Sequence, residues 1–155
     1  MWIKLLLSVC IVAFATALGY FAAGKWRARK NFYTQLCSFH DRFLNELNYA
    51  RKPLADFLKE YSYKGDFEKL LRDFEKGRDF AVNFSYLTKE ERTECENYFS
   101  MLGKGDSLSQ KGYFSAQTAS LSQKREQSRK DAKSRGDLYL KLGLLAGLAV
   151  VILIV

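Results

Sequence analysis

LLLSVCIVAFATALGYFAA, the apolar run from Leu5 to Ala23, decides the architecture that the sequence predicts. As an α-helix, this run spans roughly 28 Å, close to the roughly 30 Å hydrocarbon core of a bilayer. Lys4 is the only basic residue before it, whereas four basic residues follow it directly: Lys25, Arg27, Arg29 and Lys30. Because positive residues stay in the cytoplasm, residues 1–24 are predicted to form an uncleaved transmembrane helix whose amino terminus lies outside. A cleaved signal peptide, with a site at residues 13–15 or 15–17, is the alternative.

A second apolar run, LGLLAGLAVVILIV from Leu142 to Val155, ends the sequence. With residues 138–140 added, it spans roughly 27 Å, provided that Lys141 extends its ammonium group back to the interface. Six bases precede it: Lys124, Arg125, Arg129, Lys130, Lys133 and Arg135. Residues 138–155 are therefore predicted to run from inside to outside. The two runs indicate one topology, a two-pass protein of the cell membrane with residues 25–137 in the cytoplasm and both termini outside.

The net charge of +8 belongs almost entirely to the regions beside the apolar runs, because residues 31–123 contain 13 bases and 14 acids. A strongly basic chain ordinarily suggests a nucleic-acid partner. Here the bases lie within a few residues of the predicted bilayer, so we expect membrane orientation and contact with lipid headgroups, and no nucleic acid.

Small residues recur at intervals of four in both apolar runs: Ala15, Gly19 and Ala23 in the first, and Gly143 and Gly147 in the second. Such spacing places them on one helical face, where another backbone approaches closely. It predicts docking between membrane helices, and it is compatible with a homo-oligomer. Glycine and alanine are also common in membrane helices without any such role.

The cytoplasmic region has apolar residues at helical spacing, as in Phe32, Leu36, Phe39, Phe43 and Leu47. No stretch alternates with period two, so the sequence predicts an all-α fold, a helical bundle flanked by N- and C-terminal transmembrane helices. Most of the ten phenylalanines of this region must fill its core, and some rings are expected to line a partner surface.

Helix boundaries follow from capping residues. Pro53 ends a first helix near Ala50 and suits the first turn of a second one. Asp66 is expected to cap a third helix, which Gly77 ends. Thr88 with Glu91, and Ser107 with Gln110, have the spacing of capping boxes for two more, the first of which Gly103 ends.

The sequence pattern does not decide the secondary structure of three regions. Residues 78–87 form either a short helix or a loop. Residues 123–137 lack an apolar face, and we favour a solvated helix there over a disordered linker because they contain no proline. Gly136 is then the expected hinge of a long last helix.

No catalytic or metal-binding pattern is present. His40 has no partner at metal-ligand spacing, and Cys10, Cys37 and Cys95 are single cysteines. Gly103-Lys104-Gly105-Asp106 lacks the spacing and the Lys-Ser/Thr ending of a phosphate-binding loop. We therefore expect no enzyme, no metal and no cofactor.

Three stretches together resemble the stage III sporulation protein AB family of endospore-forming bacteria. They are residues 46–54 (ELNYARKPL), similar to the family's acidic-apolar-x-Tyr pattern followed by Thr-Pro-Leu; residues 102–110, similar to its Leu-Gly-x-x-Asp with a following Gln; and the closing membrane helix from Leu142. The chain departs from the family at Lys52, where a threonine would cap the next helix, and at Gly105, often serine.

The resemblance implies a helical domain similar to the cytoplasmic domains of type II secretion and type IV pilus platform proteins. It also implies a non-enzymatic role on the mother-cell side of a channel complex that joins mother cell and forespore. The partners implied are a cytoplasmic secretion-type ATPase and other stage III sporulation membrane proteins.

Two turns between helices are the candidate partner-binding site, since both could lie at one end of the bundle. Their residues are Tyr49, Arg51, Lys52, Pro53, Leu54, Gly103, Lys104, Asp106 and Gln110. Helix capping alone is the alternative role. A lipid-binding scaffold that uses the two basic clusters is the alternative function, ahead of nucleic-acid binding and of an enzyme.

Overall fold

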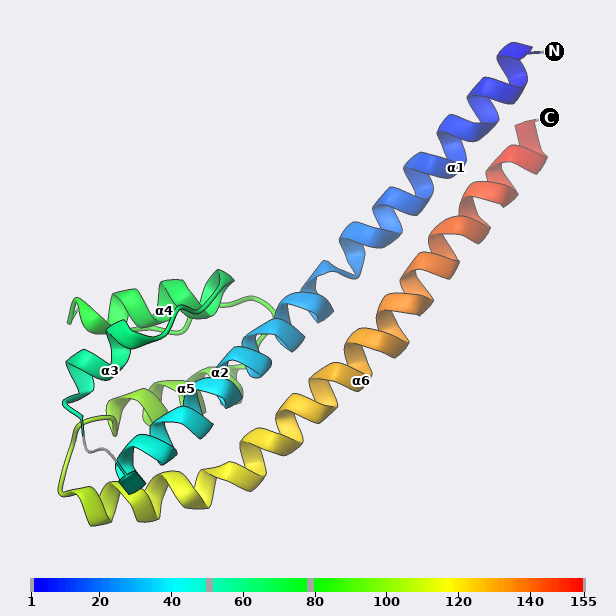
Figure 1. Ribbon diagram of the computed structural model, residues 1–155. Coiled ribbons are helices and arrows are strands. Elements are labelled where there is room, and N and C mark those ends of the chain that lie inside the picture. The colour runs from blue at the N-terminus through cyan, green and yellow to red at the C-terminus, as the bar shows by residue number, and fades with distance from the viewer. Residues whose placement is uncertain (1, 50–51, 78–79, 155) are drawn as a thin grey trace. The chain divides into compact units, whose positions relative to one another are not determined.

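The structure is a computed structural model, and it describes residues 2–49, 52–77 and 80–154. Over these ranges it is all-helical and contains no strand, as the sequence predicts (Figure 1). Its helices are α1 (Trp2–Ala22), α2 (Gly24–Tyr49), α3 (Leu54–Glu60), α4 (Gly65–Glu75), α5 (Lys89–Ser100) and α6 (Ser107–Ile154).

The chain divides into two compact units. The terminal unit consists of residues 1–30 and 127–155, and the central unit consists of residues 31–126. Helices α2 and α6 each contribute one part to each unit. The bases and the apolar runs that predict membrane insertion therefore fall mainly in the terminal unit.

In the terminal unit, α1 and the last part of α6 lie side by side and run in opposite directions (Figure 1). Both are long and apolar enough to cross a membrane. Between α1 and α2 the helix is interrupted at Ala23, although the Ala23 amide still donates to the Gly19 carbonyl at 3.1 Å. The Trp26 amide in turn donates to the Ala23 carbonyl at 3.2 Å, so the chain continues in nearly helical form.

The central unit has an aromatic core. Seven phenylalanines are buried there: Phe32, Phe39, Phe43, Phe57, Phe67, Phe99 and Phe114. Their rings meet mostly edge-to-face or tilted, an arrangement that adds favourable quadrupole contacts to the burial of apolar surface. The other three, Phe74, Phe80 and Phe84, are partly buried against this core. These three rings alone among the ten phenylalanines keep appreciable exposed surface, and the expectation that some rings line a partner surface stays a prediction.

Several of the predicted helix ends are confirmed. Thr88 and Glu91 form the capping box of α5, because the Glu91 amide donates to Thr88 Oγ1 and the Thr88 amide donates to Glu91 Oε2. Gly77 follows the end of α4 with φ of +60°, and Gly103 follows α5 with φ of +74°. Only glycine takes this left-handed conformation at little cost, which explains why both helices end there.

Two other predicted caps are wrong. Helix α4 begins at Gly65 after Lys64, and the Asp66 carboxylate instead accepts hydrogen bonds from Tyr86 Oη at 3.0 Å and Lys69 Nζ at 3.3 Å. Helix α6 begins at Ser107 itself, so the cap lies one residue earlier than predicted. Asp106 Oδ1 accepts the Ser109 amide at 3.3 Å.

The less determined regions are also settled by the structure. Residues 80–87 contain no helix, whereas residues 123–137 are helical throughout. The hinge expected at Gly136 is absent, because α6 continues through this glycine. A single interior glycine costs about 1 kcal/mol relative to alanine, which a helix of 48 residues tolerates. Pro53 precedes α3, and its carbonyl accepts the amides of Asp56 and Phe57. Ala50, where the first helix was expected to end, lies outside the described residues.

Candidate functional site

The two turns singled out in the sequence meet at one end of the central unit. They line an open pocket of about 210 Å³ whose walls are Phe43, Leu47, Lys52, Leu54, Gly103, Ser107 and Gln110. Leu54 Cδ2 lies so close to Gly103 that a Cβ added to this glycine would be 3.1 Å away. Residues 52–54 and 103–110 therefore form one surface, although about 50 residues of chain separate them.

Hydrogen bonds fix both turns. The Lys52 amide donates to Glu46 Oε1 at 3.2 Å, and Lys52 Nζ lies 2.9 Å from Glu60 Oε2. Gln110, which was expected to close a capping box, instead donates from Nε2 to the Lys104 carbonyl at 3.1 Å. The hydrogen bond from the Ser109 side chain lowers the pKa of the Asp106 carboxyl group. Capping and pocket formation are thus performed by the same residues.

Exposed apolar side chains lie close in sequence to the residues that line this pocket. The fractional exposure is 86% at Tyr49, 77% at Leu108 and 37% at Met101. These three residues and the pocket are called the apolar end below. The sequence does not single out Met101, directly after α5, or Leu108, in the first turn of α6, because a large apolar residue at a helix end is more often buried. Pro53 and Lys104 are also exposed, whereas Arg51 lies outside the described residues.

The small residues of the two apolar runs lie at the contact between α1 and α6. A Cβ added to Gly19 would be 2.5 Å from the Tyr139 carbonyl oxygen, and one added to Gly143 would be 2.7 Å from the Ala15 carbonyl oxygen. One added to Gly147 would be 3.1 Å from Ala15 Cβ. The small-residue faces are thus occupied within one chain. Ala23 is buried, but it lies at the interruption between α1 and α2.

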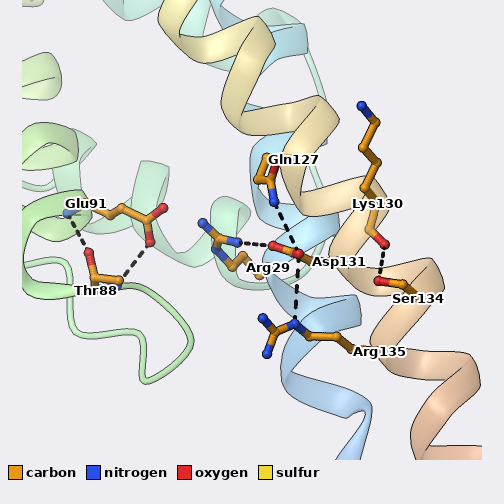
Figure 2. A network of polar contacts seen from close by, with 8 residues as sticks. All are labelled: Arg29, Thr88, Glu91, Gln127, Lys130, Asp131, Ser134 and Arg135. Atoms are coloured by element: carbon orange, nitrogen blue, oxygen red, sulfur yellow. Dashed lines mark hydrogen bonds and ion pairs between the residues drawn. The ribbon is translucent and has the colours of Figure 1, made fainter.

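The two basic clusters are joined by Asp131 in the terminal unit (Figure 2). Its carboxylate lies 3.1 Å from Arg29 Nη1 and 3.9 Å from Arg135 Nε, and it accepts a hydrogen bond from Gln127. The guanidinium group of Arg135 also lies over the ring of Trp26, 4.3 Å from its centroid. Residues 102 positions apart in the chain are therefore in direct contact.

The other residues of the two basic clusters differ in their contacts and exposure. Arg27 donates to the Tyr20 carbonyl at 2.6 Å and covers the Tyr20 ring. Lys124 pairs with Glu94 inside the central unit, to which Arg125 also belongs. Lys30 is half-buried, and four others are exposed: Lys25, Arg129, Lys130 and Lys133.

His40 is a buried structural residue in the described central unit. Its Nδ1 lies 3.0 Å from Tyr98 Oη, and its Nε2 lies 3.0 Å from Thr118 Oγ1. Burial also raises the pKa values of the free thiols of Cys37 and Cys95, to about 11 and about 12. Among the described residues, no group of three His, Cys, Asp or Glu side chains is arranged to hold a metal ion.

The burial of His40 leads to a prediction about pH. Burial lowers its pKa in the folded state, so the unfolded chain binds a proton more readily than the folded chain. Stability should therefore be full above the unfolded pKa of about 6.5 and should fall as the pH decreases through it, by at most about 1.4 kcal/mol per pH unit. Urea unfolding of the protein at several pH values between about 7 and 5.5 measures this slope. The variant His40→Gln should be flat over the same range, and an equal slope in both proteins would contradict the assignment.

The family model for stage III sporulation protein AB matches residues 4–155, essentially the whole chain. The chain belongs to the stage III sporulation protein AB family. No curated protein and no solved structure matches it. The matched range includes nearly all of α1, all of the described part of α6 and both turns of the apolar end.

Proposed function

We propose that this protein is a non-enzymatic platform in the membrane of the sporulating mother cell. The terminal unit would anchor it as a two-pass membrane protein, with the central unit in the cytoplasm. It would belong to a type II secretion-like channel complex between mother cell and forespore. Family membership supports a role in stage III of sporulation, and the two long apolar helices are compatible with the anchor.

The observation that carries a docking role is the apolar end. Apolar side chains that are exposed in a group mark interaction sites, and Tyr49, Met101 and Leu108 are exposed and all lie within three residues of a pocket residue in the chain. Aromatic anchors beside a pocket are typical of the centres of protein interfaces. We infer that a cytoplasmic secretion-type ATPase binds there and that other stage III sporulation membrane proteins contact the terminal unit.

A binding role fits the chemistry of the apolar end better than catalysis does. Its lysine Lys52 is paired with Glu60, Gln110 is engaged with a backbone carbonyl, and Asp106 caps a helix. A catalytic group must be available to a substrate proton or carbon, whereas these groups maintain the turn geometry. What remains accessible is mainly apolar surface.

The test is substitution of exposed residues of the apolar end in the sporulating host. Tyr49→Ala combined with Leu108→Ser removes apolar contact area from exposed positions, so folding should be retained. We expect the variant to reach the membrane at normal levels but to lose co-purification of the ATPase. Forespores should engulf normally and then shrink or stall.

The control replaces two exposed side chains that lie away from the apolar end. Lys64→Ala with Lys69→Ser alters two exposed residues at α4 and should leave both ATPase recovery and sporulation normal. Normal recovery of the ATPase with the Tyr49 and Leu108 variant would contradict the docking role. Helix capping would then be the only role left for the two turns.

A further inference from the structure

The whole net charge of the protein lies on the terminal unit. Residues 1–30 and 127–155 contain 10 bases and two acids, whereas residues 31–126 contain 15 of each. The terminal unit therefore carries the full +8, and the central unit is neutral. Bases that serve only to keep a protein soluble would be expected on both units.

In the structure, the two basic segments of this unit lie next to each other at the same position along the pair of helices. In the antiparallel pairing, Gly19 faces Tyr139, Trp26 faces Arg135 and Arg29 faces Asp131. The exposed bases Lys25 and Lys133 each lie within two residues of the pair formed by Trp26 and Arg135. Cations from two helices therefore lie along the same short section of the terminal unit.

We propose that residues 25–30 and 129–135 form a single cationic collar that binds the phosphate headgroups of anionic phospholipids. The proposal rests on the membrane insertion given under Proposed function. The terminal unit holds two carboxylates, Asp131 and Asp137, against ten bases, so it keeps a large net positive charge. Phosphate groups supply the missing negative charge.

The position of the collar identifies the source of the phosphate. Arg27 turns back along the helix to the Tyr20 carbonyl, and its guanidinium group lies 3.6 Å from the Tyr20 ring centroid. The cations of Lys25 and Arg135 both lie over the ring of Trp26, at 5.1 Å and 4.3 Å from its centroid. Tryptophan, tyrosine and extended basic side chains together are typical of the headgroup level of a membrane. A nucleic acid would instead have to bind where apolar helices begin.

Trp26 itself can report on the lipids beside it, because the chain contains only two tryptophans. The full-length variant Trp2→Phe, with Trp26 as the single tryptophan, is reconstituted in phosphatidylcholine vesicles. These contain a minor fraction of either brominated phosphatidylglycerol or brominated phosphatidylcholine, whose bromines quench tryptophan fluorescence on contact. We expect phosphatidylglycerol to quench Trp26 at least about twofold more strongly than phosphatidylcholine at equal content.

Two further variants make the test specific. Lys130→Gln with Lys133→Gln should remove most of the excess quenching, whereas Lys59→Gln with Lys64→Gln, the same charge change on the central unit, should preserve it. An excess of inorganic phosphate should not reduce it, since the site requires headgroups in a bilayer.

The other outcomes overturn the proposal. Equal quenching by the two brominated lipids would show an inserted protein without anionic preference, whereas no quenching by either would refute the membrane insertion itself. If both lysine variants lost the excess quenching by phosphatidylglycerol, the effect would be one of total charge rather than of the collar. Displacement of the lipid by short duplex DNA would assign the bases to nucleic acid.

Discussion

Replacing Phe39 by alanine should lower the free energy of unfolding of the central unit by about 3–5 kcal/mol. Phe39 has no exposed surface and occupies the middle of the aromatic core. Its ring meets five others: Phe43, Phe57, Tyr63, Phe67 and Phe99. Alanine would lose both the buried apolar area and these ring contacts and would leave a cavity. Since small domains are stable by only about 5–15 kcal/mol, this loss is a large part of the total and should raise the ratio of unfolded to folded protein by about a hundredfold or more.

Urea unfolding of the full chain in mild detergent, followed by the near-ultraviolet circular dichroism of the buried aromatic residues, measures this effect. Tyr49→Ala is the matched control, because it removes an aromatic ring that is 86% exposed. It should change the unfolding free energy by no more than about 0.5 kcal/mol. Similar losses for the two variants would mean that the aromatic core does not determine the stability of the central unit.

Gly143→Ala should separate the helices of the terminal unit. The added methyl group would lie 2.7 Å from the Ala15 carbonyl oxygen, a backbone atom that cannot move without shifting α1. Overpacking of this kind typically costs about 1–3 kcal/mol, enough to reduce the paired state by about fivefold or more. Gly19→Ala should act in the same way, since its Cβ would be 2.5 Å from the Tyr139 carbonyl oxygen.

Gly136→Ala is the control on the same helix. A Cβ at this position meets nothing within 4 Å, so the substitution should stabilise α6 by about 1 kcal/mol through helix propensity alone. Pairing is measured in membranes by cross-linking Cys10 to Val150→Cys, because both positions line the same apolar hollow between α1 and α6. Cys37 and Cys95 are buried and should not compete. Equal cross-linking in the Gly143 and Gly136 variants would contradict close backbone packing.

The sequence predicts the local structure well because that structure depends on neighbours in the chain. The apolar spacing of α2 and the Thr88–Glu91 pair are signals within a few residues of the structure that they specify. The two wrong caps have different causes, because no side chain caps the start of α4, whereas the cap of α6 is the residue before the predicted one. The tertiary partner Tyr86 takes the carboxylate of Asp66, and Asp106 precedes Ser107 as the cap.

Contacts between distant segments could be anticipated only in part. Two apolar runs of opposite direction suggest that membrane helices lie together, and the spacing of small residues suggests which faces meet. The register in which Gly19 faces Tyr139 requires a long-range contact that neither run encodes alone. The apolar end could also be predicted only in part. The sequence identifies both turns, but the exposure of Leu108 depends on where α6 begins.

The equal numbers of acids and bases in the central unit have a kinetic consequence. A partner approaching a unit without net charge gains no long-range attraction, so association should proceed at the unsteered rate of about 10⁵–10⁶ M⁻¹s⁻¹. The speed of encounter would then depend little on ionic strength, and selectivity would reside in how slowly the complex dissociates.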